Sequence, residues 1–193
     1  MKKIFFLLTL SLNFFFLKGQ STLPGGFLKG YILTKTDTIH CYVLNKDFFK
    51  NCEVVKYKFS KDDKVQEVYI ENIIEVRDNS LLYKKLTFNG KSFLAIQHIK
   101  GPVSLYELNY TYQISGFHYN AQYNSNGVYF LEKSNKLIKV ERDGYKDYVK
   151  MILTDDPETT KKIDESLQKY KDVPVYIKLL VNNYNTWLNS KAN

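Results

Sequence analysis

The sequence lacks the short motifs by which most catalytic sites are recognised. It has no glycine-rich phosphate loop, no G-x-S-x-G elbow, no H-E-x-x-H and no C-x-x-C. Its histidines, His40, His98 and His118, lie far apart on different predicted strands, so they do not form a set of metal ligands. We therefore expect no metal site and no bound cofactor, and this absence favours a protein that is not an enzyme.

Concentrated positive charge is also missing. The formal net charge is +8, but the lysines are spread along the chain among acids and apolar residues. Proteins that bind nucleic acids usually gather basic side chains on one face or stripe. The basic residues are therefore read as a solubilising surface, and no nucleic-acid partner is expected.

Only one long apolar run is present, and it lies at the N-terminus. Lys2 and Lys3 precede a mostly apolar stretch over 4–17, which is shorter than the roughly twenty residues of a membrane-spanning helix. This pattern predicts a secretory signal peptide over 1–20, cleaved near Gly19, with an uncleaved anchor as the alternative. No cysteine lies at that position, so the mature protein is expected in the periplasm or at the cell surface without a lipid anchor. Removing residues 1–20 takes away three lysines and no acid, which lowers the formal charge from +8 to +5.

Cysteine is scarce. Cys41 and Cys52 are the only two, and both belong to the exported part, where disulfides persist. A bridge between them would close a short hairpin and stabilise the fold by ~3 kcal/mol. Two buried free thiols are the other interpretation, and the sequence does not decide between them.

Strand signals dominate the chain from about residue 27 to 141. Short β-branched and aromatic runs such as GYILT, TIHCYVL, EVVKYKF and KLIKVE alternate with polar turns. Asn89-Gly90 separates two of these runs and is a strong hairpin signal. Further turns are expected at Asn124 to Gly127 and at Ser134-Asn135. About ten short strands are predicted, which favours an antiparallel barrel, roll or sandwich.

The hydrophobic period changes to that of a helix from about residue 143. Asp156-Pro157 has the residue types of a helix start, and Asp172 begins another helical stretch. Three helices are expected, and each has an apolar stripe to bury on the sheet. We therefore predict an α+β fold with one domain over 21–193 and no separate helical domain.

Tyrosine is abundant, with 16 in the chain and a concentration between residues 107 and 130. Tyr119 and Tyr123, together with Asn120 and Gln122, have the chemistry of a surface that stacks on sugar rings and hydrogen-bonds beside them. These four residues are the candidate ligand site for a glycan. Because tyrosine is also a good strand former, a purely structural role is the competing interpretation.

Two neighbouring tyrosines and several strand acids complete the candidates. Tyr110 and Tyr112 share one strand face with Ile114, which predicts that they are packed. A hydrolase would need two facing carboxylates. The acids on predicted strands that supply this alternative are Glu67, Glu71, Glu75 and Glu107.

The layout of the chain also carries a family resemblance. The residues that carry it are Gly30-Tyr31-Ile32, Asp37-Thr38-Ile39, Val103 to Glu107, Val128 to Lys133, Asp156-Pro157-Glu158 and Asn183-Tyr184-Asn185. The sequence resembles a family of uncharacterised exported proteins of the Bacteroidota over most of its mature length. That family has no established activity, so the resemblance implies export and a strands-then-helices order, and it implies no catalytic residue. The stretch 108–127 matches no motif of the family, which favours a variable hairpin there.

These observations favour an exported envelope protein that serves as a non-enzymatic interaction or scaffold module, whose partner is an envelope protein or a glycan. The first alternative is a glycan-binding module that uses the tyrosine-rich hairpin. The second is a hydrolase with paired carboxylates.

Overall fold

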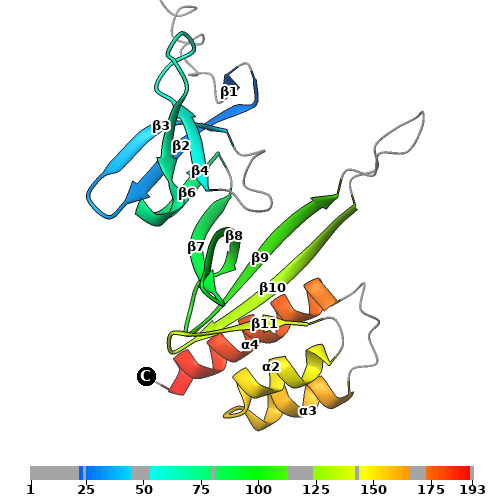
Figure 1. Ribbon diagram of the computed structural model, residues 1–193. Helices are drawn as coiled ribbons and strands as arrows, with labels where there is room; N and C mark the ends of the chain where they lie inside the picture. The colour runs from blue at the N-terminus through cyan, green and yellow to red at the C-terminus, as the bar shows by residue number, and fades with distance from the viewer. Residues whose placement is uncertain are drawn as a thin grey trace, which may run out of the picture.

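The computed structural model describes residues 22–23, 25–44, 53–79, 81–112, 124–141, 144–165 and 173–191. Within these residues an antiparallel sheet of eleven strands is followed by three α-helices (Figure 1). The predicted α+β class, with a β-rich body and C-terminal helices, is confirmed.

The elements follow one another along the chain as a run of strands and then a run of helices. The strands are β1 (Thr22–Leu23), β2 (Phe27–Thr34), β3 (Thr38–Leu44), β4 (Val54–Lys58), β5 (Gln66–Tyr69), β6 (Ile73–Asp78), β7 (Leu82–Phe88), β8 (Lys91–Ile99), β9 (Val103–Tyr112), β10 (Asn124–Lys133) and β11 (Lys136–Val140). The helices are the short 3-10 helix η2 (Ile70–Asn72) and the α-helices α2 (Tyr145–Leu153), α3 (Pro157–Glu165) and α4 (Val173–Lys191).

The first part of the sheet must curl, and the strand order shows why. The order is β11-β10-β9-β8-β7-β6-β2-β3-β4-β5, with β1 added beside β2. Only the three residues of η2 join β5 to β6, and such a link spans at most about 14 Å. In a flat sheet, four strand spacings would separate these two strands by about 19 Å. The strands β2 to β6 therefore form what we call the rolled half of the sheet (upper part of Figure 1).

The rolled half closes around its own apolar core. This core combines β-branched and aromatic side chains from β2 to β8 and from η2. Its members are Ile32, Cys41, Val43, Val55, Tyr57, Ile70, Ile73, Val76, Tyr83, Leu94 and Ile96. Backbone hydrogen bonds from Ile70 to Glu53 and from Lys35 to Asn72 tie the η2 link to the neighbouring strands.

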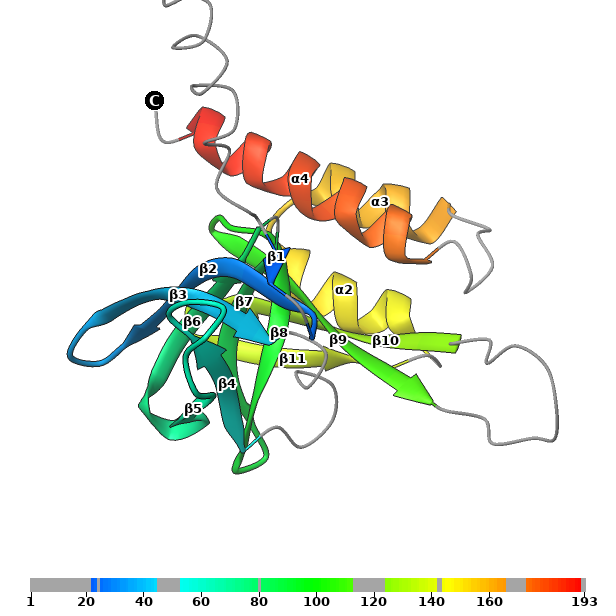
Figure 2. The same cartoon turned by 90° about the horizontal axis from the view of Figure 1, so that it is seen from above.

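The rest of the sheet runs from β7 to β11, and we call it the helix-covered half because helices cover one face of β8 to β11 (Figure 2). Its side chains alternate as a pleated strand requires. In β9, Val103 and Leu105 pack with the helices, whereas Tyr106 and Leu108 belong to a second cluster with Phe130. The core under the helices consists of Val103, Leu105, Tyr129, Leu131, Ile138, Val140, Tyr145, Val149, Ile152, Leu153, Ile163, Ile177, Leu180, Val181 and Tyr184.

The start of α3 agrees with its prediction. The side chain of Asp156 accepts hydrogen bonds from the backbone N–H of Glu158 at 3.1 Å and from the hydroxyl of Thr159. Asp156 is only 3% exposed. The acid therefore caps the helix, and Pro157 occupies the first helical position as expected.

Of the predicted turns, Asn89-Gly90 and Ser134-Asn135 are confirmed, with positive φ at all four residues. The turn predicted over 124–127 is wrong. These residues lie in β10, where they pair with residues 109–112 of β9. Gly127 is needed for space, because a Cβ there would lie 2.5 Å from an oxygen of the Glu107 carboxylate.

Over the described ranges, no helix has both the length and the apolar character needed to cross a membrane. The predicted signal peptide, residues 1–20, lies outside the described residues.

Candidate functional site

The predicted glycan site lies outside the described residues. Tyr119, Asn120, Gln122 and Tyr123 all fall between the ends of β9 and β10, and the site stays a prediction. The two strands that lead to this segment are paired from Val103 opposite Lys133 to Tyr112 opposite Asn124.

Cys41 lies inside the rolled half, only 4% exposed, and forms no disulfide within the described residues. Burial raises the pKa of this thiol to about 12. Because the thiolate is the reactive form of cysteine, Cys41 is not an activated nucleophile near neutral pH. Cys52 lies outside the described residues, so its pairing with Cys41 stays a prediction.

The four acids considered for a hydrolase lie on four different elements: Glu67 in β5, Glu71 in η2, Glu75 in β6 and Glu107 in β9. Glu67 forms an ion pair with Lys56, and Glu75 accepts hydrogen bonds from Tyr31 and Lys84. The contacts described for these carboxylates are with basic side chains and hydroxyl groups. They therefore give no support to a hydrolase that uses paired carboxylates.

The most concentrated group of titratable side chains lies where α4 crosses the sheet. The pairing of β8 with β9 shifts register between Gln97 and Ile99, which places His98 in a β-bulge. His98 Nε2 donates a hydrogen bond to the Glu107 carboxylate on β9. Bulges redirect a side chain out of the regular alternation, and here the bulge allows His98 to meet Glu107.

Glu107 is held as a carboxylate by its surroundings. Burial alone would raise its pKa, but the hydrogen bond and charge of His98, together with Lys178 on α4 and the hydroxyl of Tyr129, hold the pKa below its ordinary value. The side chains of His98 and Glu107 are only 22% and 16% exposed. The pair joins β8 to β9, and Lys178 of α4 acts on Glu107 through its charge; we call His98 and Glu107 the polar clasp.

A second polar cluster joins the helices to β10. Lys133 donates to the carboxylate of Asp155 at 2.7 Å and to the backbone carbonyl of Ile152 at 2.9 Å. The hydroxyl of Tyr184 donates to the same carboxylate, and the Lys133 ammonium lies 4.8 Å from the centre of the Tyr184 ring. Burial would lower the pKa of Lys133, but Asp155 and Tyr184 raise it. These contacts join β10 to α4 and to the turn after α2.

No group of three or more histidine, cysteine or acidic side chains suited to a metal ion occurs among the residues that the structure describes.

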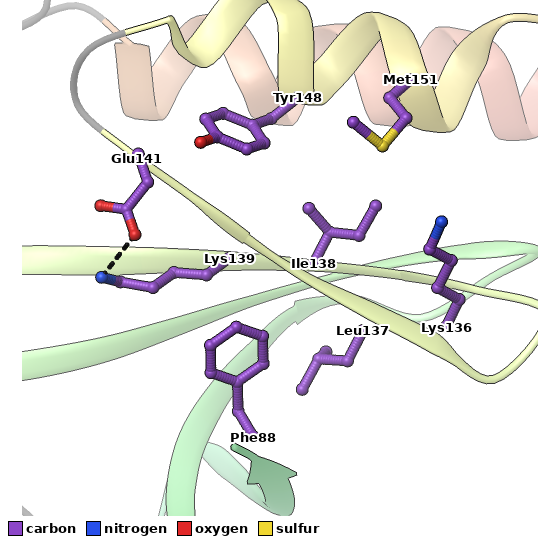
Figure 3. A pocket seen from close by; sticks show the side chains of 8 residues that line it. All are labelled: Phe88, Lys136, Leu137, Ile138, Lys139, Glu141, Tyr148 and Met151. Carbon is purple, nitrogen blue, oxygen red and sulfur yellow. Dashed lines mark ion pairs between the residues drawn. The ribbon is translucent and has the colours of Figure 1, made fainter.

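An open cavity of about 310 Å³ surrounds the last strand of the sheet (Figure 3). Its lining comes from both sides of β11. Tyr148 and Met151 descend from α2 toward Ile138, while Leu137 points the other way, toward Phe88 (Figure 3). We call this cavity the β11 groove. It is lined by Phe88, Lys136, Leu137, Ile138, Lys139, Glu141, Tyr148 and Met151.

The β11 groove is apolar with a cationic rim. Met151 is 52% exposed, and it adjoins the half-buried apolar side chains of Tyr148 and Leu137 that also line the cavity. Lys139 forms an ion pair with Glu141 at 2.7 Å. Lys136 is exposed and has no ion pair within the part of the chain that the structure describes. Glu141 is the one acid that lines this cavity, and it is neutralised by Lys139.

Sequence reasoning missed both the polar clasp and the β11 groove. His98 and Glu107 were each considered as separate candidates. Their contact depends on a register shift between β8 and β9, which the residue types do not indicate. KLIKV was predicted as a strand, and only the strand order shows that it forms an edge of the sheet.

Comparison with known proteins finds no match: no family model, no curated protein and no solved structure is significantly similar to this chain. The resemblance to exported proteins of the Bacteroidota therefore stays a prediction.

Proposed function

We propose that the protein is an exported, non-enzymatic interaction module of the cell envelope, and that it binds a partner through the β11 groove. One observation carries this proposal. The groove combines an edge strand, the exposed Met151 and half-buried apolar side chains on both of its sides, and a cationic rim. Exposed apolar surface next to a sheet edge is the usual setting for a protein contact.

The positions of the titratable groups support a binding role. His98 is engaged by Glu107 within the sheet, and Lys133 is engaged by Asp155 between β10 and the turn after α2, so these charges already have structural partners. The groove itself is lined by one carboxylate, Glu141, which is already paired. General acid–base catalysis needs a titratable group within reach of a substrate proton, and the described groove favours docking over such chemistry.

Export is part of the proposal and is supported by the N-terminal pattern of Lys2 and Lys3 followed by the apolar stretch 4–17. The test is N-terminal sequencing of the protein recovered from the envelope fraction of the source cells. We expect a first residue near Gln20 or Ser21. Retention of Met1 would contradict cleavage.

Photo-crosslinking in living cells tests the binding surface. A photoreactive residue replaces Met151 in the groove, and in a control protein it replaces Phe59, which is 51% exposed on the rolled half. We expect a discrete adduct of higher mass from position 151 and none of that size from position 59. Equal adducts at both positions, or no adduct at position 151, would contradict docking at the groove.

The non-enzymatic part of the proposal has its own test. The purified mature protein is incubated with a panel of cell-wall fragments and glycans, and the products are followed by mass spectrometry. We expect no turnover. Turnover that disappears in Glu107→Gln would replace this proposal with a catalytic role for the clasp.

A further inference from the structure

The main-chain groups of β11 that face away from the sheet can be identified from its hairpin. Ser134 and Asn135 have φ of 50° and 64°, which is the two-residue turn with positive φ at both positions. Such a turn makes its flanking residues, Lys133 and Lys136, a hydrogen-bonded pair. Hydrogen-bonded and non-hydrogen-bonded pairs then alternate along β11.

Leu137 and Lys139 are therefore the residues whose N–H and C=O groups point outward. Leu137 lies opposite Glu132 and Lys139 lies opposite Phe130, both in the non-hydrogen-bonded positions of the β10–β11 pair. β11 is an end of the strand order, so no further strand of the described residues pairs with it. Its outer side is a row of main-chain donors and acceptors that another strand can use.

We propose that this row is a strand-addition site for an extended, acidic peptide segment of a partner protein. The inference rests on the proposed function and names how the partner binds. In this mode main-chain hydrogen bonds hold the incoming strand, and pockets for alternate side chains select it.

The groove provides such pockets on both faces of β11. Successive side chains of an added strand point to opposite faces of the sheet. One set would meet Ile138, Tyr148 and Met151 under α2, and the other would meet Leu137 and Phe88 (Figure 3). Apolar residues at successive positions of the peptide are therefore accommodated, one on each side.

Charge decides which kind of strand fits. Lys136 and Lys139 lie on the rim, and one of the two charges is left without an acid among the described residues. A glutamate or aspartate at the end of the incoming segment would supply the missing acidic partner. A second copy of β11 would instead bring its own lysines next to these, and like charges on adjacent strands are destabilising. The lysines thus act against self-pairing and in favour of an acidic partner.

The test uses a short synthetic peptide with a Val-Ile-Val centre and glutamates at both ends, titrated into the mature protein. Binding is followed by the anisotropy of a label on the peptide and by amide shifts at residues 137 and 139. Two control peptides carry either lysines at the ends or N-methyl groups on the central amides. We expect saturable binding of the acidic peptide, weakened about fivefold to tenfold by loss of the main-chain donors.

Two variants of one residue separate the main chain from the charge. Lys139→Pro removes the outward N–H, the charge and the ion pair with Glu141 but no hydrogen bond to β10, whereas Lys139→Gln removes only the charge and that ion pair. We expect a larger loss of affinity with Pro than with Gln, and a salt-dependent loss with Gln. If the Pro variant does not fold, the N-methylated peptide tests the same hydrogen bonds on the wild-type protein.

Each outcome has a definite meaning. Equal binding of the acidic and N-methylated peptides, or no binding of the acidic peptide, overturns strand addition. If the crosslink from position 151 persists in either of those cases, the interaction module stands and only its mode is wrong. A dimer of the mature protein that disappears in Lys139→Pro would make a second copy the occupant and overturn the acidic-peptide assignment.

Discussion

Among the described residues β5 and β11 stand at the two ends of the strand order, but their exposed sides differ. β5 has four residues with the burial of a solvent-facing strand, and it carries Glu67 and the exposed Tyr69. After the exposed Lys136, β11 alternates between half-buried and buried positions, with α2 on one side and Phe88 on the other. Short, polar edges discourage pairing with other chains. The sheet therefore has one protected edge and one that can accept a partner.

The same contrast separates the two halves of the sheet. The rolled half buries its face by curling around a core to which β7 and β8 also contribute, whereas the helix-covered half needs α2, α3 and α4 to do so. Loss of a helix contact should therefore lower the stability of the helix-covered half more than that of the rolled half.

The largest effect is expected from Gly30→Ala, which would open the rolled half. Gly30 pairs with Asp78 across β2 and β6, and a Cβ at this position would lie 1.8 Å from the carbonyl oxygen of Arg77. The backbone must shift, so we expect a loss of about 3 kcal/mol in the free energy of unfolding, measured by urea denaturation. Gly90→Ala is the control, because it meets only open space at φ of 74°. It should lose about 1 kcal/mol, and an equal loss at both sites would contradict the tight β2–β6 approach.

Asn185→Ala should loosen the helix-covered half alone. Asn185 is 8% exposed, and its amide accepts from the N–H of Val103 at 2.9 Å and donates to the carbonyl of Val103 at 2.8 Å. Removing the amide leaves two buried main-chain groups without partners, so we expect a loss of about 2 kcal/mol. Hydrogen exchange should accelerate in α4 and β9 and remain slow in β2 and β3. Asn183→Ala, on the exposed side of the same helix, should change little.

Part of the fold follows from local sequence signals, and part depends on contacts between distant residues. The period of apolar residues and the Asn89-Gly90 turn predict strands and helices well, because both signals are local. The turn predicted over 124–127 failed because Gly127 serves a contact with Glu107 on the neighbouring strand. The curl of the rolled half depends on which strand pairs with β2, and that pairing is not local.

The candidate site was harder to predict than the fold. His98 and Glu107 are separated by a turn and meet only through a register shift, which no residue type signals. The β11 groove combines Phe88, β11 and α2. Phe88, β11 and α2 each contribute side chains of the kind found in any core. The groove can therefore be recognised only when the strand order is known to place β11 at the edge of the sheet.

The polar clasp should make the helix-covered half sensitive to acid. The pKa of Glu107 is lower in the folded protein than its ordinary value of 4.5. The clasp therefore contributes stability above that value, and the contribution is lost as the pH falls through the folded-state pKa. In Glu107→Gln this part of the pH dependence should disappear, so the urea midpoint should fall less steeply below about pH 5. Parallel curves for both proteins would contradict the clasp, and Glu67→Gln at the exposed β5 edge is the control.

The smallest effect is expected at the protected edge itself. Lys56 and Glu67 form an ion pair at 3.9 Å across β4 and β5, with side chains that are 40% and 52% exposed. Water and salt screen such a pair, so a double-mutant cycle with Lys56→Gln and Glu67→Gln should give a coupling below about 0.5 kcal/mol. The matched cycle on Lys133 and Asp155, which share contacts with Tyr184, should give about 1 kcal/mol. A larger coupling at Lys56–Glu67 would mean that charge pairing holds the β5 edge closed. A coupling below that value would mean that the β5 edge avoids a partner through its short length and its exposed polar side chains. These are the features that distinguish it from β11.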